Sequence, residues 1–309
     1  MLRVALIVNP TAGSRAGARR APALKAALER ASASAEIFET KGPGDAQRIA
    51  GECFHQPFDV IAVVGGDGTL NEVSQAYLDQ DGNPRSGPPL AVLPLGTGGD
   101  FRKTLGLGAG LDEAVERLLA SEPRPFDLGV LDVTTHDGGR ARRAFVNITS
   151  FGLGGLTDRI VNSGPKWLGG KAAFYLATFR GLLAYRNAPV RVTVDGEVWL
   201  ESPIVNVALA NGRYFGGGMM IAPEADPSDG KLDVVALGDL TKLETVGLTQ
   251  HIYSGSHLGR PGITSTRGSV VEAEALVPNE QVLIDMDGET PGRLPLVARV
   301  APGALWIRA

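Results

Sequence analysis

The order of apolar and polar positions divides the chain into two parts with different patterns. Up to about residue 125, short runs of β-branched residues alternate with amphipathic segments, which is typical of an α/β domain. The runs predict strands at residues 4–8, 35–39, 60–64 and 90–93. The amphipathic segments predict helices at residues 22–30, 45–53, 69–78 and 112–120.

In the rest of the chain, alternation with a period of two dominates the pattern. It predicts strands at residues 128–134, 144–149, 190–194, 205–209, 232–237, 269–275, 281–285 and 296–300. One long helical segment, at residues 171–185, interrupts them. We therefore expect an α/β domain over residues 1–126 and an antiparallel β-sandwich with helical insertions over residues 127–309. The last strand could return to the first domain.

Composition excludes several classes of protein. Hydrophobic residues make up 43% of the 309 residues and charged residues 21%, which are ordinary globular values. The net charge of −4 and the lack of a dense Lys/Arg run argue against a nucleic-acid partner. A single cysteine, Cys53, excludes an internal disulfide, and no apolar stretch reaches the roughly 18 residues that span a bilayer. We expect a soluble, cytoplasmic protein.

The most informative segment joins a predicted strand to a predicted helix. The apolar run at residues 60–64 leads into Gly65, Gly66, Asp67, Gly68 and Thr69. Three glycines around an acid let successive backbone N–H groups face one anion, and the helix N-terminus adds a positive dipole. The segment therefore predicts a phosphate-binding turn. The alternative is an ordinary strand–turn–helix with Asp67 as a cap, but a cap does not require three glycines.

A second glycine turn, at residues 95–101, follows the next predicted strand. In a parallel sheet, turns after neighbouring strands lie at the same carboxyl edge, where ligands bind. Taken alone, this turn could equally be a plain loop. It gains weight from the first turn because each of the two supplies a threonine and an aspartate.

Two acidic segments in the second part have two interpretations each. Carboxylates at the end of a strand in residues 284–289 could hold a general base, although an Asp-Gly hairpin turn explains the same residues. In the loop at residues 222–232, Asp229 and neighbouring carbonyls offer the oxygen ligands that Mg²⁺ prefers. An ordinary turn is the alternative there.

Taken together, these segments resemble the bacterial soluble lipid kinases that have a diacylglycerol kinase catalytic domain. That family is similar to sphingosine and ceramide kinases and, more distantly, to NAD kinase. The matching motifs run in the family's order over nearly the whole chain, at residues 9–13, 65–72, 95–101, 211–218, 229–233 and 287–289. The first glycine turn alone is less specific, because NAD kinases and phosphofructokinases share versions of it.

The resemblance implies a three-layer α/β nucleotide-binding domain, a β-sandwich lipid-substrate domain and an active site in the cleft between them. It implies ATP- and Mg²⁺-dependent phosphorylation of a lipid hydroxyl, with diacylglycerol or a related glycerolipid favoured. Such an enzyme would contact a membrane surface transiently during turnover, and a homodimer is compatible with the family. The alternatives are another small-molecule kinase, similar to NAD kinase, or a non-catalytic nucleotide- or lipid-binding regulator.

The resemblance also assigns roles to individual residues. Glu289 matches the general base, with Asp67 as a further catalytic residue and Asp287 as the next candidate for the base. The residues that would contact ATP are Asn9, Pro10, Thr11, Gly13, Ser14, Thr40, Gly65, Gly66, Asp67, Gly68, Thr69, Leu70, Asn71 and Thr97.

Two magnesium sites follow from the same resemblance. Asp67, Asp100 and Asp127 would organise a catalytic Mg²⁺. A structural Mg²⁺ would take the side chain of Asp229 and the carbonyls of Asp226 and Lys231 as ligands.

The chain departs from the family pattern at one position and carries one further apolar segment. Gly99 stands where the family usually has asparagine, so a side-chain amide near the phosphates is absent. The apolar-rich segment at residues 167–185 could line an acyl-chain cleft or contact a membrane surface. A helix that packs on its own domain is the alternative.

Overall fold

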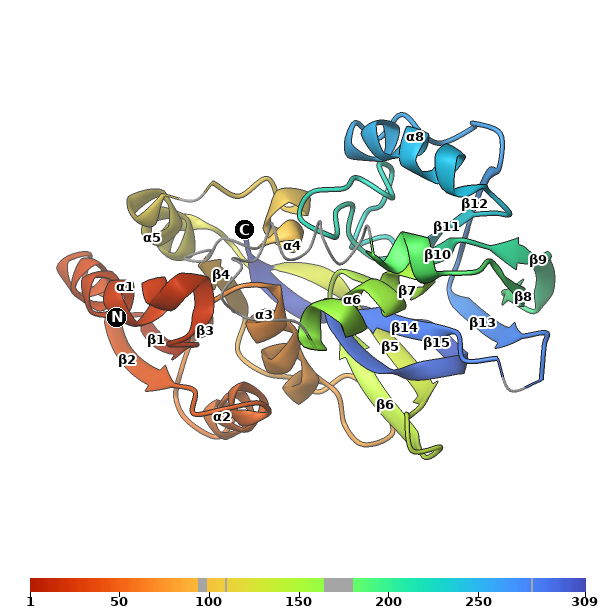
Figure 1. Ribbon diagram of the computed structural model, residues 1–309. Coiled ribbons are helices and arrows are strands. Elements are labelled where there is room, and N and C mark those ends of the chain that lie inside the picture. The colour runs from red at the N-terminus through yellow and green to blue at the C-terminus, as the bar shows by residue number, and fades with distance from the viewer. Residues whose placement is uncertain (94–98, 109, 164–179, 279) are drawn as a thin grey trace. The chain divides into compact units, whose positions relative to one another are not determined.

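The computed structural model describes residues 1–93, 99–108, 110–163, 180–278 and 280–309 (Figure 1). Contacts within the chain define two compact units. Unit 1 comprises Met1–Leu128 and Ala301–Ala309, and unit 2 comprises Gly129–Val300. The chain passes between the units within two strands, β5 (Arg124–Thr134) and β15 (Glu289–Arg308). The domain boundary predicted from the sequence lies between residues 126 and 127.

A parallel sheet forms the centre of unit 1. Its strands are β1 (Arg3–Val8), β2 (Ser34–Glu39), β3 (Val60–Val64) and β4 (Leu90–Leu93), in the order β2–β1–β3–β4. The end of β15 pairs with β4 in the parallel direction, through Ile307 and Leu90. Every residue of β3 and β4 is buried. Both strands therefore read as continuous apolar runs, as expected for parallel strands covered on both faces.

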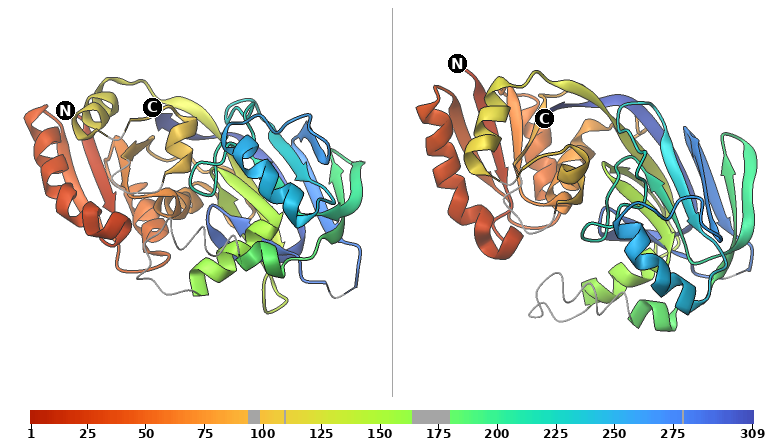
Figure 2. Two further views of the ribbon diagram at one scale, coloured as in Figure 1. Left: turned by 45° about the horizontal axis from the view of Figure 1, so that its top comes forward. Right: turned by 90° about the horizontal axis from the view of Figure 1, so that it is seen from above.

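Helices cover the two faces of this sheet (Figures 1 and 2). Apolar side chains of α1 and α5 share one core with Val4, Leu6 and Val8 of β1. The alternate residues of β1 point to the other face, where α2 and α3 pack on each other and on the strands. The helices of unit 1 are α1 (Ala12–Arg30), α2 (Asp45–Cys53), α3 (Asp67–Ser74), α4 (Asp100–Thr104) and α5 (Leu111–Ala120), and a 3₁₀ turn, Gln75–Tyr77, follows α3.

The predicted start of the first helix was wrong. α1 begins at Ala12, and Pro22 lies inside it. The side chain of Asn9 accepts a hydrogen bond from the backbone N–H of Thr11 at 3.0 Å, which turns the chain directly into the helix. Gly17 then lets the helix pass close to the end of β1, because a Cβ at this position would lie 2.7 Å from the carbonyl oxygen of Asn9. The helix that follows the phosphate turn, α3, also starts earlier than predicted. It begins at Asp67, whereas the predicted helix began at residue 69.

Unit 2 consists mainly of antiparallel strands. One run of paired strands has the order β12–β11–β10–β7–β14–β15, and β15 also pairs with β13 and β5, which lead to β8, β9 and β6. The strands other than β5 and β15 are β6 (Arg140–Phe145), β7 (Ile148–Gly152), β8 (Ala188–Val194), β9 (Glu197–Ile204), β10 (Asn206–Ala210), β11 (Leu232–Leu237), β12 (Ile263–Gly268), β13 (Val270–Ala275) and β14 (Leu283–Met286). The described connections between them include the helices α6 (Leu153–Ser163) and α8 (Lys242–Tyr253).

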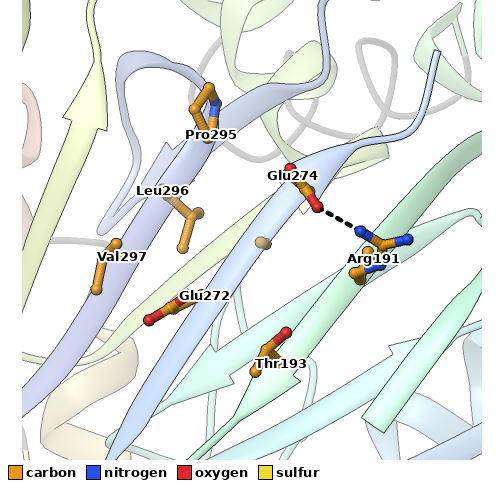
Figure 3. Close-up of a pocket in the computed structure, with 8 residues that line it drawn as sticks. Arg191, Thr193, Glu272, Glu274, Pro295, Leu296 and Val297 are labelled. Carbon is orange, nitrogen blue, oxygen red and sulfur yellow. Dashed lines mark hydrogen bonds and ion pairs between the residues drawn. The ribbon is translucent and has the colours of Figure 1, made fainter. Parts of the chain in front are cut away.

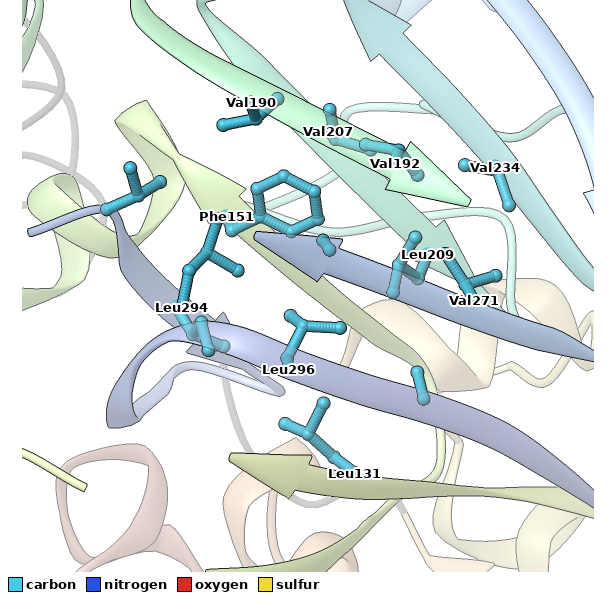
Figure 4. Close-up of a cluster of buried hydrophobic side chains, with 14 of the residues drawn as sticks. Leu131, Phe151, Val190, Val192, Val207, Leu209, Val234, Val271, Leu294 and Leu296 are labelled. Carbon is cyan, nitrogen blue, oxygen red and sulfur yellow. The ribbon is translucent and has the colours of Figure 1, made fainter. Parts of the chain in front are cut away.

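A hydrophobic core lies between strands of unit 2 (Figure 4), and a second cluster packs α8 against β10, β11 and β12. The first core gathers side chains of β7 and β10, such as Phe151 and Leu209, against side chains of β8, β13 and β15, such as Val190, Val271 and Leu296. Burial of apolar surface between strands of one unit is the main source of stability for such a sandwich. The predicted fold class, an α/β domain followed by a β-sandwich, is confirmed.

Several predicted elements of unit 2 need correction. The strand predicted at residues 144–149 is two strands, β6 and β7, because the backbone at Val146 and Asn147 turns its N–H groups toward Asp287. β9 and β12 were missed, since both are largely exposed and lack a clear alternation. Of the helix predicted at residues 171–185, residues 180–184 are helical and residues 171–179 lie outside the described part. Among the described residues, no helix is long and apolar enough to cross a bilayer.

The contact between α6 and β14 gives a stability prediction. A Cβ on Gly155 of α6 would overlap the backbone of Leu283, so Gly155→Ala is expected to lower the free energy of unfolding by about 1–3 kcal/mol. Gly51, in α2, has open space around its Cβ position, so Gly51→Ala is expected to raise that energy by up to about 1 kcal/mol. Urea unfolding of both variants checks this, and a stable Gly155→Ala protein would contradict the close contact.

Candidate active site

The parallel strands of unit 1 end on one line. Val8 pairs in register with both Glu39 and Val64, and Val64 pairs with Leu93. The residues that follow these strands therefore lie at the same carboxyl edge of the sheet, which is where parallel α/β sheets bind ligands. Asn9, Thr40 and Gly65 occupy that edge. The predicted contact residue Thr97 lies outside the described residues.

The predicted phosphate turn connects β3 to α3 at this edge. A Cβ on Gly65 would lie 2.5 Å from the hydroxyl oxygen of Thr69, so the turn closes only with glycine there. Gly66 is the N-cap residue, and its carbonyl accepts hydrogen bonds from Thr69 and Leu70 at 3.1 Å each. Within the described residues, no side chain caps α3. Its first N–H groups and its positive dipole end, with Gly68 exposed, form an arrangement suited to an anion.

Asn9 ties the end of β1 to the first turn of α3. Its side-chain amide donates to the hydroxyl of Thr69 at 3.3 Å, and its carbonyl oxygen accepts from the N–H and the hydroxyl of Thr11 at 3.0 and 2.8 Å. The backbone N–H of Thr40 donates to Val8 at 2.9 Å and so holds the end of β2 beside β1. Of the other predicted ATP contacts here, Pro10 and Thr11 precede α1, and Gly13 and Ser14 lie in its first turn.

Two of the predicted ATP contacts face the interior. The residues Leu70 and Asn71 are each only 2% exposed. The carbonyl oxygen of the Asn71 side chain accepts a hydrogen bond from Gln75 at 3.1 Å. Neither residue is therefore presented at the surface of this edge.

The predicted acidic network is only partly brought together. The carboxylate of Asp67 accepts hydrogen bonds from the backbone N–H groups of Asp100 at 2.7 Å and Phe101 at 3.4 Å, which joins the two glycine turns. The Asp100 carboxylate pairs with Lys103 at 2.7 Å. Asp127 is 2% exposed and accepts from the N–H of Gly303 at 2.9 Å, so its carboxylate holds the end of β15.

The donor set at the Asp67 turn nevertheless fits one nucleotide-bound Mg²⁺. In the part of the chain that the structure describes, no three His, Cys, Asp or Glu side chains gather as a metal cage. Kinases do not need such a cage, because Mg²⁺ is usually held by one or two carboxylates together with phosphate oxygens and water. Asp67 is partly exposed beside the uncapped end of α3 and can supply one of those carboxylates.

Gly99, the position that departs from the family pattern, has a structural explanation. It is the N-cap residue of α4 with φ of +141°, a backbone conformation that favours glycine. An asparagine side chain at this position would be strained. The backbone at residue 99 is therefore one that glycine adopts easily and asparagine does not.

Asp287 of unit 2 binds backbone donors. Its carboxylate accepts hydrogen bonds from the N–H groups of Val146, Asn147 and Ile148 at 2.8, 3.2 and 2.9 Å. Its own N–H donates to the carbonyl of Ile148 at 3.0 Å. These bonds attach the β14–β15 turn to the corner between β6 and β7. They favour a structural role for Asp287 over the predicted catalytic one and leave the exposed Glu289, at the start of β15, as the candidate base.

Asp285 belongs to the predicted acidic segment at residues 284–289, but the sequence analysis gave it no role and missed its partner on α6. Asp285 is 7% exposed, and its carboxyl group accepts from the hydroxyl of Ser150 at 3.3 Å and from the N–H of Gly288 at 3.0 Å. Its carboxyl group also lies beside that of Asp158, where α6 packs on β14. Burial and then the negative charge of Asp158 raise the pKa of Asp285 well above its ordinary value of 3.8. Alternation along β14 places Asp285 on the face opposite the core residues Ile284 and Met286, and α6, which was not predicted, packs on this strand.

The predicted structural magnesium site is neutralised by an arginine. The carboxylate of Asp229 forms an ion pair with Arg267 and accepts a hydrogen bond from the N–H of Lys231 at 3.0 Å. Arg267 also forms an ion pair with Asp233 at 3.3 Å. The side chain of Asp226 accepts from the N–H and the hydroxyl of Ser228 at 3.0 and 2.6 Å. The oxygen donors suit Mg²⁺, but a bound ion would have to compete with the guanidinium group.

A pocket of about 200 Å³ lies over β8, β13 and β15 of unit 2 (Figure 3). Arg191 within it is bonded to Glu201 and to Glu274, each at 2.9 Å. The charge of Arg191 is thus paired, and none of the predicted site residues lines the pocket. We assign it no part in the site.

The bonds of Asp287 give a second stability prediction. Asp287 has φ of +50°, so Asp287→Gly removes the carboxylate without adding backbone strain. The loss of three charged hydrogen bonds is expected to lower the free energy of unfolding by at least about 2 kcal/mol. The control is Ser32→Gly, a glycine at another positive φ (61°), which is expected to leave stability unchanged or higher. Equal stabilities of the two variants in urea would refute the role of the carboxylate.

Comparison with known proteins covers both units. Residues 3–131 match the model of the diacylglycerol kinase catalytic domain, and residues 147–309 match the YegS C-terminal NAD kinase beta sandwich-like domain. A diacylglycerol kinase of Bacillus subtilis is 29% identical, covering 96% of this chain and 92% of its own. A probable lipid kinase YegS-like of Pseudomonas aeruginosa is 30% identical, covering 96% of this chain and 91% of its own.

The fold agrees with these matches. A crystal structure of a "putative diacylglycerol kinase" from Bacillus anthracis superimposes with a TM-score of 0.74 at 27% identity, covering 99% of this chain and 96% of that one. Both family models and a 30% identical relative thus point the same way. The chain is a kinase, and it belongs to the bacterial YegS-like lipid kinases of the diacylglycerol kinase catalytic domain family.

Proposed function

We propose that this kinase transfers the γ-phosphate of ATP to the hydroxyl of a membrane glycerolipid, with Mg²⁺ as cofactor. The observation that carries the proposal is the shared strand register, which places Asn9, Thr40 and the Gly65 turn at one edge. The names of the relatives support diacylglycerol as the acceptor, since the Bacillus subtilis protein is a diacylglycerol kinase.

The groups at this edge suit a bound triphosphate. The uncapped end of α3 offers backbone N–H groups and a positive dipole to phosphate oxygens. Asn9, held between Thr11 and Thr69, keeps the ends of β1 and β3 in place beside them. Asp67 would supply a carboxylate to the metal, and Mg²⁺, when bound, neutralises charge on the phosphates. Phosphoryl transfer asks a protein mainly for positioning and charge stabilisation.

Glu289 is our candidate for the general base. It is exposed at the start of β15, one residue beyond a turn that Asp287 and Asp285 both hold by hydrogen bonds. A carboxylate in this position can accept the proton of an acceptor hydroxyl as the oxygen attacks phosphorus. The oxygens of Asp287 are already bonded to three backbone N–H groups, so we propose Glu289 for this step and not Asp287.

A glycerolipid acceptor has a consequence for where the reaction takes place. Because its acyl chains stay in a bilayer, we propose that the kinase works at a membrane surface and binds its lipid from there. The predicted cytoplasmic location and the predicted homodimer remain predictions.

The role of Glu289 gives the test of the proposed function. Glu289→Gln keeps the shape of the side chain but cannot accept the hydroxyl proton. We expect single-turnover phosphorylation of diacylglycerol in mixed micelles to fall by about 10²–10⁴-fold, with ATP affinity and melting temperature unchanged. Single-turnover conditions are needed because slow product release can hide a slower chemical step.

The matched control for that variant is Glu272→Gln, an exposed glutamate on β13 outside the proposed site. It is expected to keep the native rate. A fall of less than tenfold for Glu289→Gln would exclude Glu289 as the base.

The Asp229 loop gives a metal prediction. A ligand that binds only the folded state raises the melting temperature, so Mg²⁺ at Asp229 should stabilise the nucleotide-free protein. We expect Asp229→Ala to lose this response and Arg267→Ala, which removes the competing guanidinium, to enlarge it. Asp226→Ala is the control, because the proposed ligand there is a carbonyl. A native protein without any Mg²⁺ response would mean that Arg267 alone neutralises Asp229.

A further inference from the structure

The carboxyl groups of Asp158 and Asp285 lie next to the turn at residues 286–289, which includes Glu289. Asp285 comes from β14, and Asp158 comes from α6, which follows β7 without a break. Two glycines bring the helix onto the strands. A Cβ on Gly154 would lie 2.5 Å from the hydroxyl oxygen of Ser150, and one on Gly155 would overlap the backbone of Leu283. This close packing places the carboxyl group of Asp158 against that of Asp285.

The contact between the two acids requires a proton. Two ionised carboxylates only accept hydrogen bonds, so a bond between them exists only when one of them is protonated. Burial raises the pKa of both groups, and Asp285, the more deeply buried, is the better place for the proton. Its hydroxyl then donates to Asp158 while its other oxygen accepts from Gly288 at 3.0 Å. All polar atoms of the Asp285 side chain are used in this arrangement.

The same bonds restrain the turn at residues 286–289. Asp287 and Gly288 both have positive φ, at +50° and +88°, so the turn has an unusual backbone that needs support. Asp287 attaches it to residues 146–148, and Asp285 holds the N–H of Gly288 from the other side. Gly288 immediately precedes Glu289. The direction of the backbone at Glu289 thus depends on the hydrogen bonds of Asp285 and Asp287.

We propose that Asp158 and Asp285 hold one proton between them and act together as a positioning pair, which fixes the turn at residues 286–289 and so the carboxylate of Glu289. This role rests on the proposed function of Glu289 as the base. Neither member of the pair is assigned a contact with substrate.

The pair also predicts that the turn, and with it the activity, is lost at high pH. Among the described residues, the charged groups nearest to Asp285 on the elements packed against it are Asp158 and the exposed Arg159 of α6, Asp287 and Glu289 of the turn, and Arg293 of β15, which pairs with Leu283. β7 contributes the hydroxyls of Thr149 and Ser150. Because the pKa of Asp285 is raised in the folded state, its stabilising effect is lost as pH rises through that value. Two ionised carboxylates then repel each other, and the turn loosens.

Two substitutions of similar size separate the proton from the packing. Asp285→Asn keeps an oxygen for Gly288 and donates an N–H to Asp158, whereas Asp285→Leu can do neither. We expect Asp285→Leu to lower kcat for lipid phosphorylation by at least about tenfold, with the KM for ATP unchanged, because small displacements of a catalytic group are costly. Asp285→Asn is expected to stay close to the native kcat.

The pH profile supplies a readout that packing alone would not move. Native kcat is expected to fall on the alkaline side as the pair loses its proton, and Asp285→Asn is expected to lack this fall. The acidic side should be the same in both proteins. An unchanged alkaline limb in Asp285→Asn, or an Asn variant as slow as the Leu variant, would overturn the proposal.

Amide hydrogen exchange at Gly288 tests positioning without any assay of activity. Exchange should be faster in Asp285→Leu than in the native protein and native-like in Asp285→Asn, and equal exchange in all three would overturn the proposal. If Asp285→Leu does not fold, the pH profile of Asp285→Asn decides alone. Glu289→Gln is measured in parallel. Native activity of that variant would refute the proposed base, whereas the exchange rates would still judge the positioning pair.

Discussion

The shared register, which ends the parallel strands of unit 1 at the same level, is the constraint on which the proposed nucleotide site depends. β3 and β4 are buried along their whole length, and β1 is buried from Val4 to Val8. Register between such strands is set by the packing of their side chains on both faces. With Val8, Glu39 and Val64 in one row, the loops after β1, β2 and β3 must emerge at one edge. Asn9 and the Gly65 turn then need only short side-chain and backbone bonds to complete the site.

In unit 2, three acids within five residues have different environments. Asp287 is surrounded by backbone donors and attaches the turn to residues 146–148. Asp285 is buried beside Asp158, where burial favours its protonated form. Glu289 is exposed. Burial and hydrogen-bond donors therefore give the three carboxyl groups different roles, as in other enzymes with paired acids. Asp287 attaches the turn, Asp285 carries a proton, and Glu289 is the candidate base.

The sequence predicted the parts of this protein that are specified locally. The strand at residues 60–64 and that at residues 232–237 were predicted with the bounds found, because each is a buried apolar run. The Gly65 turn was recognisable because its backbone requires glycine at residue 65. The largely exposed strand β12 and the helix α8 carry no such apolar pattern and were missed. Likewise, the donors to Asp287 and the partner of Asp229 are far away in the chain, so local spacing could not reveal that these carboxylates are already engaged.

Transfer of labelled phosphate tests the account most directly. The protein would be incubated with γ-labelled ATP, Mg²⁺, vesicles that contain diacylglycerol, and NAD as a competing acceptor. The account predicts label in the chloroform-extractable lipid fraction, as a phosphorylated lipid that depends on the added diacylglycerol. Label in NADP would instead indicate a kinase of soluble dinucleotides. ATP binding without transfer to any acceptor would indicate a regulator without turnover, and either of these results would contradict the account.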